Sequence, residues 1–96
     1  PGGQVRGGHA FKKQQEFIIA LSGSFDVLVD SGTEQKVYSL NRSYYGLFIP
    51  KGYWRQMKNF STSALAVVLA STPFDDKDYL RSYDTFLAYK GVKNHG

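Results

Sequence analysis

The sequence predicts an all-β domain, a sandwich or barrel of about seven short strands, followed by a short helical segment near the C-terminus. Short runs rich in apolar residues recur along the chain, and Gly, Ser, Asn or Pro interrupts them at close intervals. Several runs alternate apolar and polar residues, which is the pattern of a strand with one buried face. Apolar residues at helical spacing appear only after residue 75.

The strands predicted in the first part of the chain are residues 5–11, 16–21, 25–30 and 35–40. The first of these contains Gly7-Gly8, and glycines inside a strand mark a bulge or a close backbone approach. The second, EFIIAL, is apolar enough to be a buried strand and ends at Ser22-Gly23-Ser24. The turn signal Ser31-Gly32-Thr33 indicates that the third and fourth strands form a hairpin.

The later predicted strands are residues 46–50, 53–60 and 64–71. After them, the acidic run 75–78 is suited to cap and charge a helix start. The apolar positions at helical spacing are Tyr79, Leu80, Tyr83, Phe86 and Leu87. Gly91 suits a C-terminal stop, and we expect residues 92–96 to be a frayed tail.

Size and composition limit the classes of function. With 96 residues the chain is one small domain, and without cysteine it has no disulfide, which favours the cytoplasm mildly. No apolar run reaches the length of about 18 residues that a membrane span needs. The net charge of +4 is scattered, so we expect no nucleic acid polymer as partner. A small phosphorylated ligand and ordinary surface charge both remain compatible with it.

Two motifs carry the functional signal. In the first, His9 and Phe11 point to the same face of an extended chain, and Glu16 and Gly23 follow. This spacing resembles the first motif of the cupins, which are jelly-roll barrels of the RmlC type, with Phe11 in place of the second histidine. The second motif runs from Pro50 through Gly52 to Asn59 and resembles the later cupin motif, with Arg55 in place of its histidine.

Metal cupins bind their ion through the motif histidines and the glutamate. Neither a phenyl ring nor a guanidinium binds a divalent metal, so two of the four ligand positions are lost. We therefore expect a cupin barrel with no metal and no other cofactor.

A narrower resemblance rests on five blocks in order: RGGHAFKK, SGSFDVLVD, GLFIPKGYWRQMKNFS, VVLAS and DDKDYLRSYD. Together they resemble the WxcM-like family of sugar-nucleotide ketoisomerases. These small cupins move the ketone of dTDP-4-keto-6-deoxyglucose from carbon 4 to carbon 3 without a metal. The resemblance implies a dTDP-linked keto sugar, or a similar nucleotide sugar, as ligand. It also implies further strands before the first motif, which we expect this chain to lack.

The resemblance implies His9 as the base that moves the proton, because histidine titrates near neutral pH. Arg55 or Tyr53 would stabilise the developing oxyanion, and Glu16 would act as a second acid or base or pair with Arg55 across the barrel. We expect Phe11 to pack or to offer a ring platform. The expected substrate-binding residues are Arg6, Phe11, Lys12, Tyr45 and Trp54, where the alternatives are surface ion pairing for Arg6 and packing for the aromatic residues.

Three hypotheses remain open at this point. The first is a working isomerase acting through a single histidine. The second is a binding module that keeps the sugar-nucleotide pocket but has lost turnover, which Phe11 favours. The third is a short cupin that only dimerises. A barrel with about seven strands leaves unpaired edges, so we expect a homodimer under each hypothesis.

Overall fold

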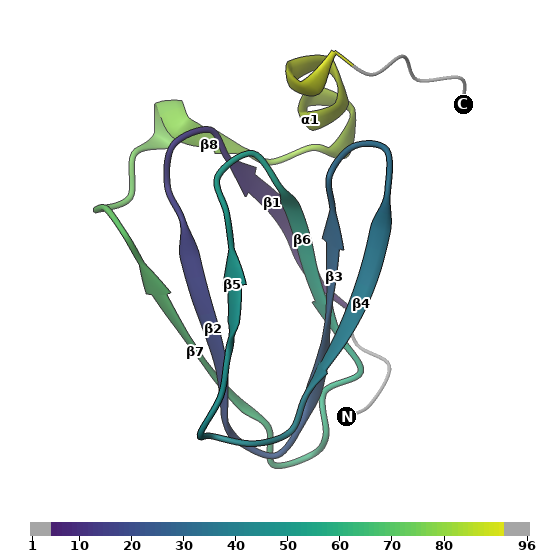
Figure 1. Cartoon of the computed structure of the whole chain (residues 1–96), viewed down its shortest axis with the longest axis vertical. Coiled ribbons are helices and arrows are strands. Elements are labelled where there is room, and N and C mark those ends of the chain that lie inside the picture. The colour runs from purple at the N-terminus through teal and green to yellow at the C-terminus, as the bar shows by residue number, and fades with distance from the viewer. Residues whose placement is uncertain (1–4, 92–96) are drawn as a thin grey trace.

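The computed structural model describes residues 5–91, with the side chains of residues 8–91. Its strands form two antiparallel sheets that face each other as a flattened barrel (Figure 1). The larger sheet has the strand order β4 (Gln35–Leu40), β3 (Phe25–Asp30), β6 (Trp54–Lys58), β1 (Val5–Phe11) and β8 (Tyr79–Leu80). The smaller has the order β5 (Leu47–Ile49), β2 (Glu16–Ser22) and β7 (Leu65–Ala70).

The main core lies between the two sheets, because each inner strand turns alternate residues inward. Phe25 and Val27 from β3 and Ile18 from β2 are at most 1% exposed. The buried members of this core are Ile18, Ala20, Phe25, Val27, Leu40, Ile49 and Met57. The same alternation places Glu16 on the inward face of β2 and Arg55 on the inward face of β6, where the two side chains meet.

A second core lies on the outer face of the larger sheet, beneath the helix α1 (Tyr83–Lys90). Trp54, Phe86 and Leu87 belong to this core, where the rings of Trp54 and Phe86 are in contact and Phe86 is fully buried. Ser82 caps the helix by accepting a hydrogen bond from the Thr85 amide, and Gly91 ends it with a φ of 75°. The predicted stop at Gly91 is therefore confirmed, whereas the predicted tail of residues 92–96 lies outside the described residues.

The structure corrects the sequence prediction at the start of this C-terminal segment. Asp75 does cap a helical turn, but this is the short 3-10 helix η1 (Asp76–Asp78). Tyr79 and Leu80 then form β8, paired with Phe11 and Ala10 of β1, instead of the first helical turn. Backbone pairing with β1 outweighs the local helical spacing, and it raises the number of strands from the predicted seven to eight among the described residues.

Turn geometry accounts for several motif residues. Gly23 has a φ of 67°, and a Cβ there would lie 2.7 Å from the backbone of Ala64, so only glycine fits. Gly52 has a φ of 79° and its amide donates to the Phe11 carbonyl at 2.7 Å. Asn59 has a φ of 57° and donates to Asp26 at 2.8 Å. These residues shape the turns at the ends of the barrel, and the candidate catalytic side chains lie on the strands between those turns.

Candidate active site

Three polar side chains meet inside the barrel although they come from three strands of two sheets. On the larger sheet, His9 of β1 lies opposite Arg55 of β6 in the strand register. Glu16 enters from β2 of the facing sheet and reaches both. We call these three residues the inner triad.

Arg55 and Glu16 form a bidentate ion pair. The Arg55 Nε donates to Glu16 Oε1 at 3.0 Å and the Nη2 donates to Oε2 at 3.1 Å. The remaining guanidinium nitrogen lies 3.0 Å from the Met57 sulfur. The exposed fractions are 7% for Arg55 and 6% for Glu16, so the pair is buried, and each charge depends on the other. The predicted pairing across the barrel is therefore confirmed.

Glu16 stays ionised throughout the neutral range. Burial alone would raise the pKa of its carboxyl, but the contacts with His9 and Arg55 outweigh burial and lower the pKa from 4.5 to about 2. Of the two residues that lower this pKa, Arg55 has the better contact geometry, because both of its hydrogen bonds are aligned with the carboxylate oxygens of Glu16. The inner triad thus contains a permanent carboxylate beside the imidazole of His9.

His9 is held against this carboxylate and against two aromatic rings. Its Nε2 lies 3.4 Å from Glu16 Oε1, an ion-pair distance without the alignment of a hydrogen bond. Among buried side-chain nitrogen and oxygen atoms of residues 8–91, only this Nε2 lacks a hydrogen-bond partner. The rings of Phe11 and Tyr79 lie at centroid distances of 5.0 and 5.1 Å. A small shift of the imidazole would align it with Glu16, which can then orient it and stabilise its protonated form.

The aromatic wall beside His9 is wider than the sequence indicated. Phe11 is 6% exposed and its ring contacts Tyr79 at 5.3 Å and Phe74 at 6.4 Å. Arg81 lies over the Tyr79 ring at 4.9 Å. Tyr79 reaches the site because β8 pairs with β1, so the helical interpretation of this segment concealed its position. Phe74 lies between the predicted strand of residues 64–71 and the acidic run 75–78, and no sequence pattern pointed to it.

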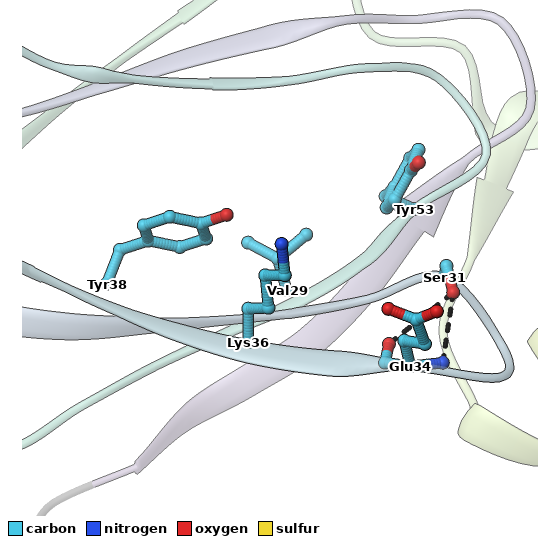
Figure 2. Close-up of a pocket in the computed structure, with 6 residues that line it drawn as sticks. All are labelled: Val29, Ser31, Glu34, Lys36, Tyr38 and Tyr53. Atoms are coloured by element: carbon cyan, nitrogen blue, oxygen red, sulfur yellow. Dashed lines mark hydrogen bonds between the residues drawn. The ribbon is translucent and has the colours of Figure 1, made fainter.

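A cleft opens on the inward face of the larger sheet, at the side of β3 and β4 (Figure 2). Its volume is about 290 Å³. The residues that line this barrel-mouth cleft are Val29, Ser31, Glu34, Lys36, Tyr38 and Tyr53. Of these, only Tyr53 was predicted as a site residue. The predicted hairpin could have revealed two more lining residues, Tyr38 and Lys36. They pair with Val27 and Val29, so they point inward when these two valines do.

The remaining predicted binding residues do not gather around the inner triad. Trp54 is 4% exposed and lies on the outer face of β6, packed against Tyr83 and Phe86 of α1. Tyr45 lies in the β4–β5 loop at the opposite end of the barrel, with its hydroxyl on Asn41.

Two further predicted residues belong to the β1 segment. Lys12 lines a separate hollow near α1, and its backbone amide donates to the Asp78 carbonyl at 3.1 Å. The side chain of Arg6 lies outside the described residues. Within the part of the chain that is described, no three His, Cys, Asp or Glu side chains converge on a point where a metal ion would fit. No helix there is long and apolar enough to cross a membrane.

Comparison with known proteins gives one consistent result. The model of the family described as FdtA, WxcM-like, C-terminal, matches residues 1–91. A TDP-4-oxo-6-deoxy-alpha-D-glucose-3,4-oxoisomerase from Aneurinibacillus thermoaerophilus is 36% identical over 88 residues, which are 92% of this chain and 63% of that protein. The present chain therefore spans less than two thirds of the length of this curated relative.

Solved structures agree with the sequence match. The TDP-quinovose 3,4-ketoisomerase WlaRB from Campylobacter jejuni is 42% identical, with a TM-score of 0.84 over 92% of this chain and 68% of that one. A variant of the 3,4-ketoisomerase QdtA from Thermoanaerobacterium thermosaccharolyticum, in complex with TDP-4-keto-6-deoxyglucose, is 32% identical. Its TM-score is 0.89 over 94% of this chain and 65% of that one. The two-sheet barrel is thus the fold of these enzymes.

Proposed function

The chain belongs to the WxcM-like FdtA family of cupins, and from this premise we propose that it moves the ketone of a TDP-linked 4-keto-6-deoxyhexose between carbons 4 and 3. The observation that carries the proposal is the buried inner triad, in which an ionised Glu16, held by Arg55, lies beside the imidazole of His9. A carboxylate that orients a histidine is a common arrangement for proton transfer near neutral pH.

His9 acts as the base. With the Nε2 proton directed to Glu16, the lone pair lies on Nδ1, which makes no hydrogen bond within the described residues. Nδ1 takes the proton from carbon 3, the electron pair of that bond forms a double bond between carbons 3 and 4, and the π pair of the carbon 4 carbonyl moves onto oxygen 4. The same nitrogen then returns the proton to carbon 4 through the electron pair of that double bond, while the hydroxyl proton of oxygen 3 passes to oxygen 4 and the pair that it leaves forms the carbonyl at carbon 3. The ketone then lies at carbon 3, and no atom is gained or lost.

The charge that develops on the sugar oxygens needs a donor. Tyr53 is available, because its hydroxyl makes no hydrogen bond within residues 8–91 and its ring lines the barrel-mouth cleft. Arg55 adds a fixed positive charge to the barrel interior, although its guanidinium is engaged with Glu16. Donors positioned before the reaction stabilise an oxyanion more than water does.

Phe11 favours a second candidate function. Its ring is buried and packs against His9, where it contributes no acid or base. A protein that binds the nucleotide sugar and turns it over slowly or not at all, as a binding or regulatory module, would carry such a ring in place of a second histidine. The two candidates share a ligand and differ in whether the carbon–hydrogen bond breaks.

Proton NMR of TDP-4-keto-6-deoxyglucose with the protein in deuterated water separates them. We expect deuterium to enter at carbon 3, and we expect His9→Asn to abolish this exchange while the ligand still binds. Thr62→Ala, an exposed position in the β6–β7 loop, is the matched control and should exchange at the wild-type rate. Ligand line broadening without exchange in the wild type would support the binding module. Full exchange in His9→Asn would exclude His9 as the base.

We also propose that the chain acts as a homodimer. Phe17 of β2 lies between Phe48 of β5 and Leu69 of β7 in the strand register, and the exposed fractions of the three are 37, 52 and 55%. An apolar row of this kind across an uncovered sheet face is typical of an interface. Light scattering should give twice the chain mass, and Phe48→Glu should halve it. A wild-type monomer at micromolar concentration would contradict the proposal.

Since nucleotide sugars are made and used in the cytoplasm, we place the protein there, in keeping with a chain that contains no cysteine. Cell fractionation with an antibody to the chain tests this assignment. Recovery in a membrane or periplasmic fraction would contradict it.

A further inference from the structure

The proposed isomerisation moves two protons, and the inner triad has a carrier for only one of them. His9 carries a proton between carbons 3 and 4, while a second proton passes from oxygen 3 to oxygen 4. Glu16 cannot donate this proton, because its pKa of about 2 keeps it ionised near neutral pH. The guanidinium of Arg55 does not lose its proton in proteins, and it is engaged with Glu16. A carrier for the second proton therefore comes from outside the inner triad.

Tyr79 is the hydroxyl-bearing side chain that packs against His9. Its ring centroid lies 5.1 Å from that of His9 and 5.3 Å from that of Phe11. Tyr79 pairs with Phe11 in the register of β8 and β1, and His9 comes two residues before Phe11, so all three side chains lie on the same inward face of the larger sheet. Within the described residues, no other tyrosine ring contacts the imidazole.

The hydroxyl of Tyr79 is free to act on a bound molecule. It makes no hydrogen bond within residues 8–91, and it is not enclosed, because the His9 Nε2 is the one buried side-chain nitrogen or oxygen there without a partner. A phenol hydroxyl both donates and accepts a hydrogen bond, as a proton carrier has to do. The hydroxyl of Tyr83, by contrast, is engaged with Asp30 on the outer side of the sheet.

Contacts on both sides of Tyr79 hold it beside β1 (Figure 1). The preceding residue, Asp78, accepts the backbone amide hydrogens of residues 12–14 at distances of 2.7 to 3.1 Å. On the other side, the Arg81 guanidinium lies over the Tyr79 ring at 4.9 Å, and Asp76 accepts a hydrogen bond from this guanidinium at 2.6 Å. The position of the ring is therefore set before a ligand binds, which an efficient acid or base requires.

We propose that Tyr79 is a catalytic proton relay between oxygen 3 and oxygen 4 of the sugar. The inference rests on the proposed function, which places carbons 3 and 4 at His9. As His9 removes the proton of carbon 3, the phenol of Tyr79 gives its proton to oxygen 4 and keeps the electron pair of the broken bond. The phenolate then takes the hydroxyl proton of oxygen 3 as the carbonyl forms at carbon 3 and His9 protonates carbon 4. The two oxygens are on neighbouring carbons, so one hydroxyl serves both, and Tyr79 ends protonated as it began.

Proton NMR of TDP-4-keto-6-deoxyglucose with Tyr79→Phe in deuterated water follows the two protons separately. The variant keeps the aromatic ring and its packing but loses the hydroxyl. His9 still exchanges the proton of carbon 3, because Tyr53 stabilises the charge on oxygen 4. We expect formation of the 3-keto sugar to fall about 100-fold or more, as for the loss of a general acid, and exchange at carbon 3 to fall less than about tenfold. Tyr44→Phe, 78% exposed in the β4–β5 loop, is the matched control and should leave both rates unchanged.

The outcomes separate this inference from the proposed function. If Tyr79→Phe forms the 3-keto sugar at the wild-type rate, the relay is wrong and the isomerase assignment stands. An equal loss of exchange and conversion in Tyr79→Phe would also overturn the relay, because a residue that only positions His9 or the sugar affects both rates alike. A wild type that exchanges deuterium but forms no 3-keto sugar would overturn the relay and keep His9 as the base. A wild type that does neither would overturn the proposed function, and the relay with it.

Discussion

Removing Arg55 should destabilise the fold because it leaves a buried carboxylate without its partner. Glu16 is 6% exposed, and its pKa falls from 4.5 to about 2 in the folded chain. That difference corresponds to about 3 kcal/mol of stability at neutral pH, at about 1.4 kcal/mol for each pKa unit. Breaking a buried pair by deleting one partner costs about 3–5 kcal/mol, so we expect Arg55→Met to lower the free energy of unfolding at pH 7 by this amount.

The double variant Glu16→Gln/Arg55→Met is the matched control, because it removes both charges and should recover most of the loss. Urea denaturation followed by fluorescence provides the measurement, since Trp54 is the single tryptophan of the chain. A loss below about 1 kcal/mol in Arg55→Met would refute the argument from burial. An equal loss in the double variant would show that the guanidinium contributes packing and not charge compensation.

The pH dependence follows from the sign of the shift. The folded pKa of Glu16 lies below its ordinary value of 4.5, so the stability it contributes is complete above that pH. This contribution should be lost progressively as the pH falls from about 4.5 to about 2. In Arg55→Met, Glu16 loses the hydrogen bonds and the charge of Arg55 that help to lower its pKa, so the difference between the variant and the wild type should shrink as the pH falls.

Three further substitutions test the surroundings of the site. Phe11→His should raise the rate of deuterium exchange if the absence of a second histidine limits turnover, and an unchanged rate in the NMR assay would contradict this. Tyr83→Phe removes the hydrogen bond of 2.5 Å to Asp30 that ties α1 to the β3–β4 hairpin, and thermal denaturation should show a loss of about 1 kcal/mol. Phe86→Ala empties a fully buried position beneath α1 and should cost about 3–5 kcal/mol in urea denaturation, whereas a loss below about 1 kcal/mol would mean that the helix is not anchored there.

Local signals in the sequence located most of the strands. The runs at residues 5–11 and 35–40 have the bounds of β1 and β4, because alternation and turn residues act over short distances. The motif glycines could be placed for the same reason, since a positive φ is a local requirement. Tyr79 shows where local signals fail. The spacing of apolar residues around it predicts a helix, but pairing with Phe11, which is distant in the sequence, places it in a strand.

The sequence by itself predicted a β barrel of the cupin type, and the resemblance of its two motifs to those of the cupins implied that His9, Glu16 and Arg55 lie in the interior and that Phe11 replaces a histidine there. Only the tertiary structure decided which of these side chains meet. The bidentate contact of Arg55 with Glu16 joins two sheets across 39 residues, and no local pattern encodes that distance. The cleft around Lys36 and Tyr38 has the same origin, because it depends on one sheet being wider than the other.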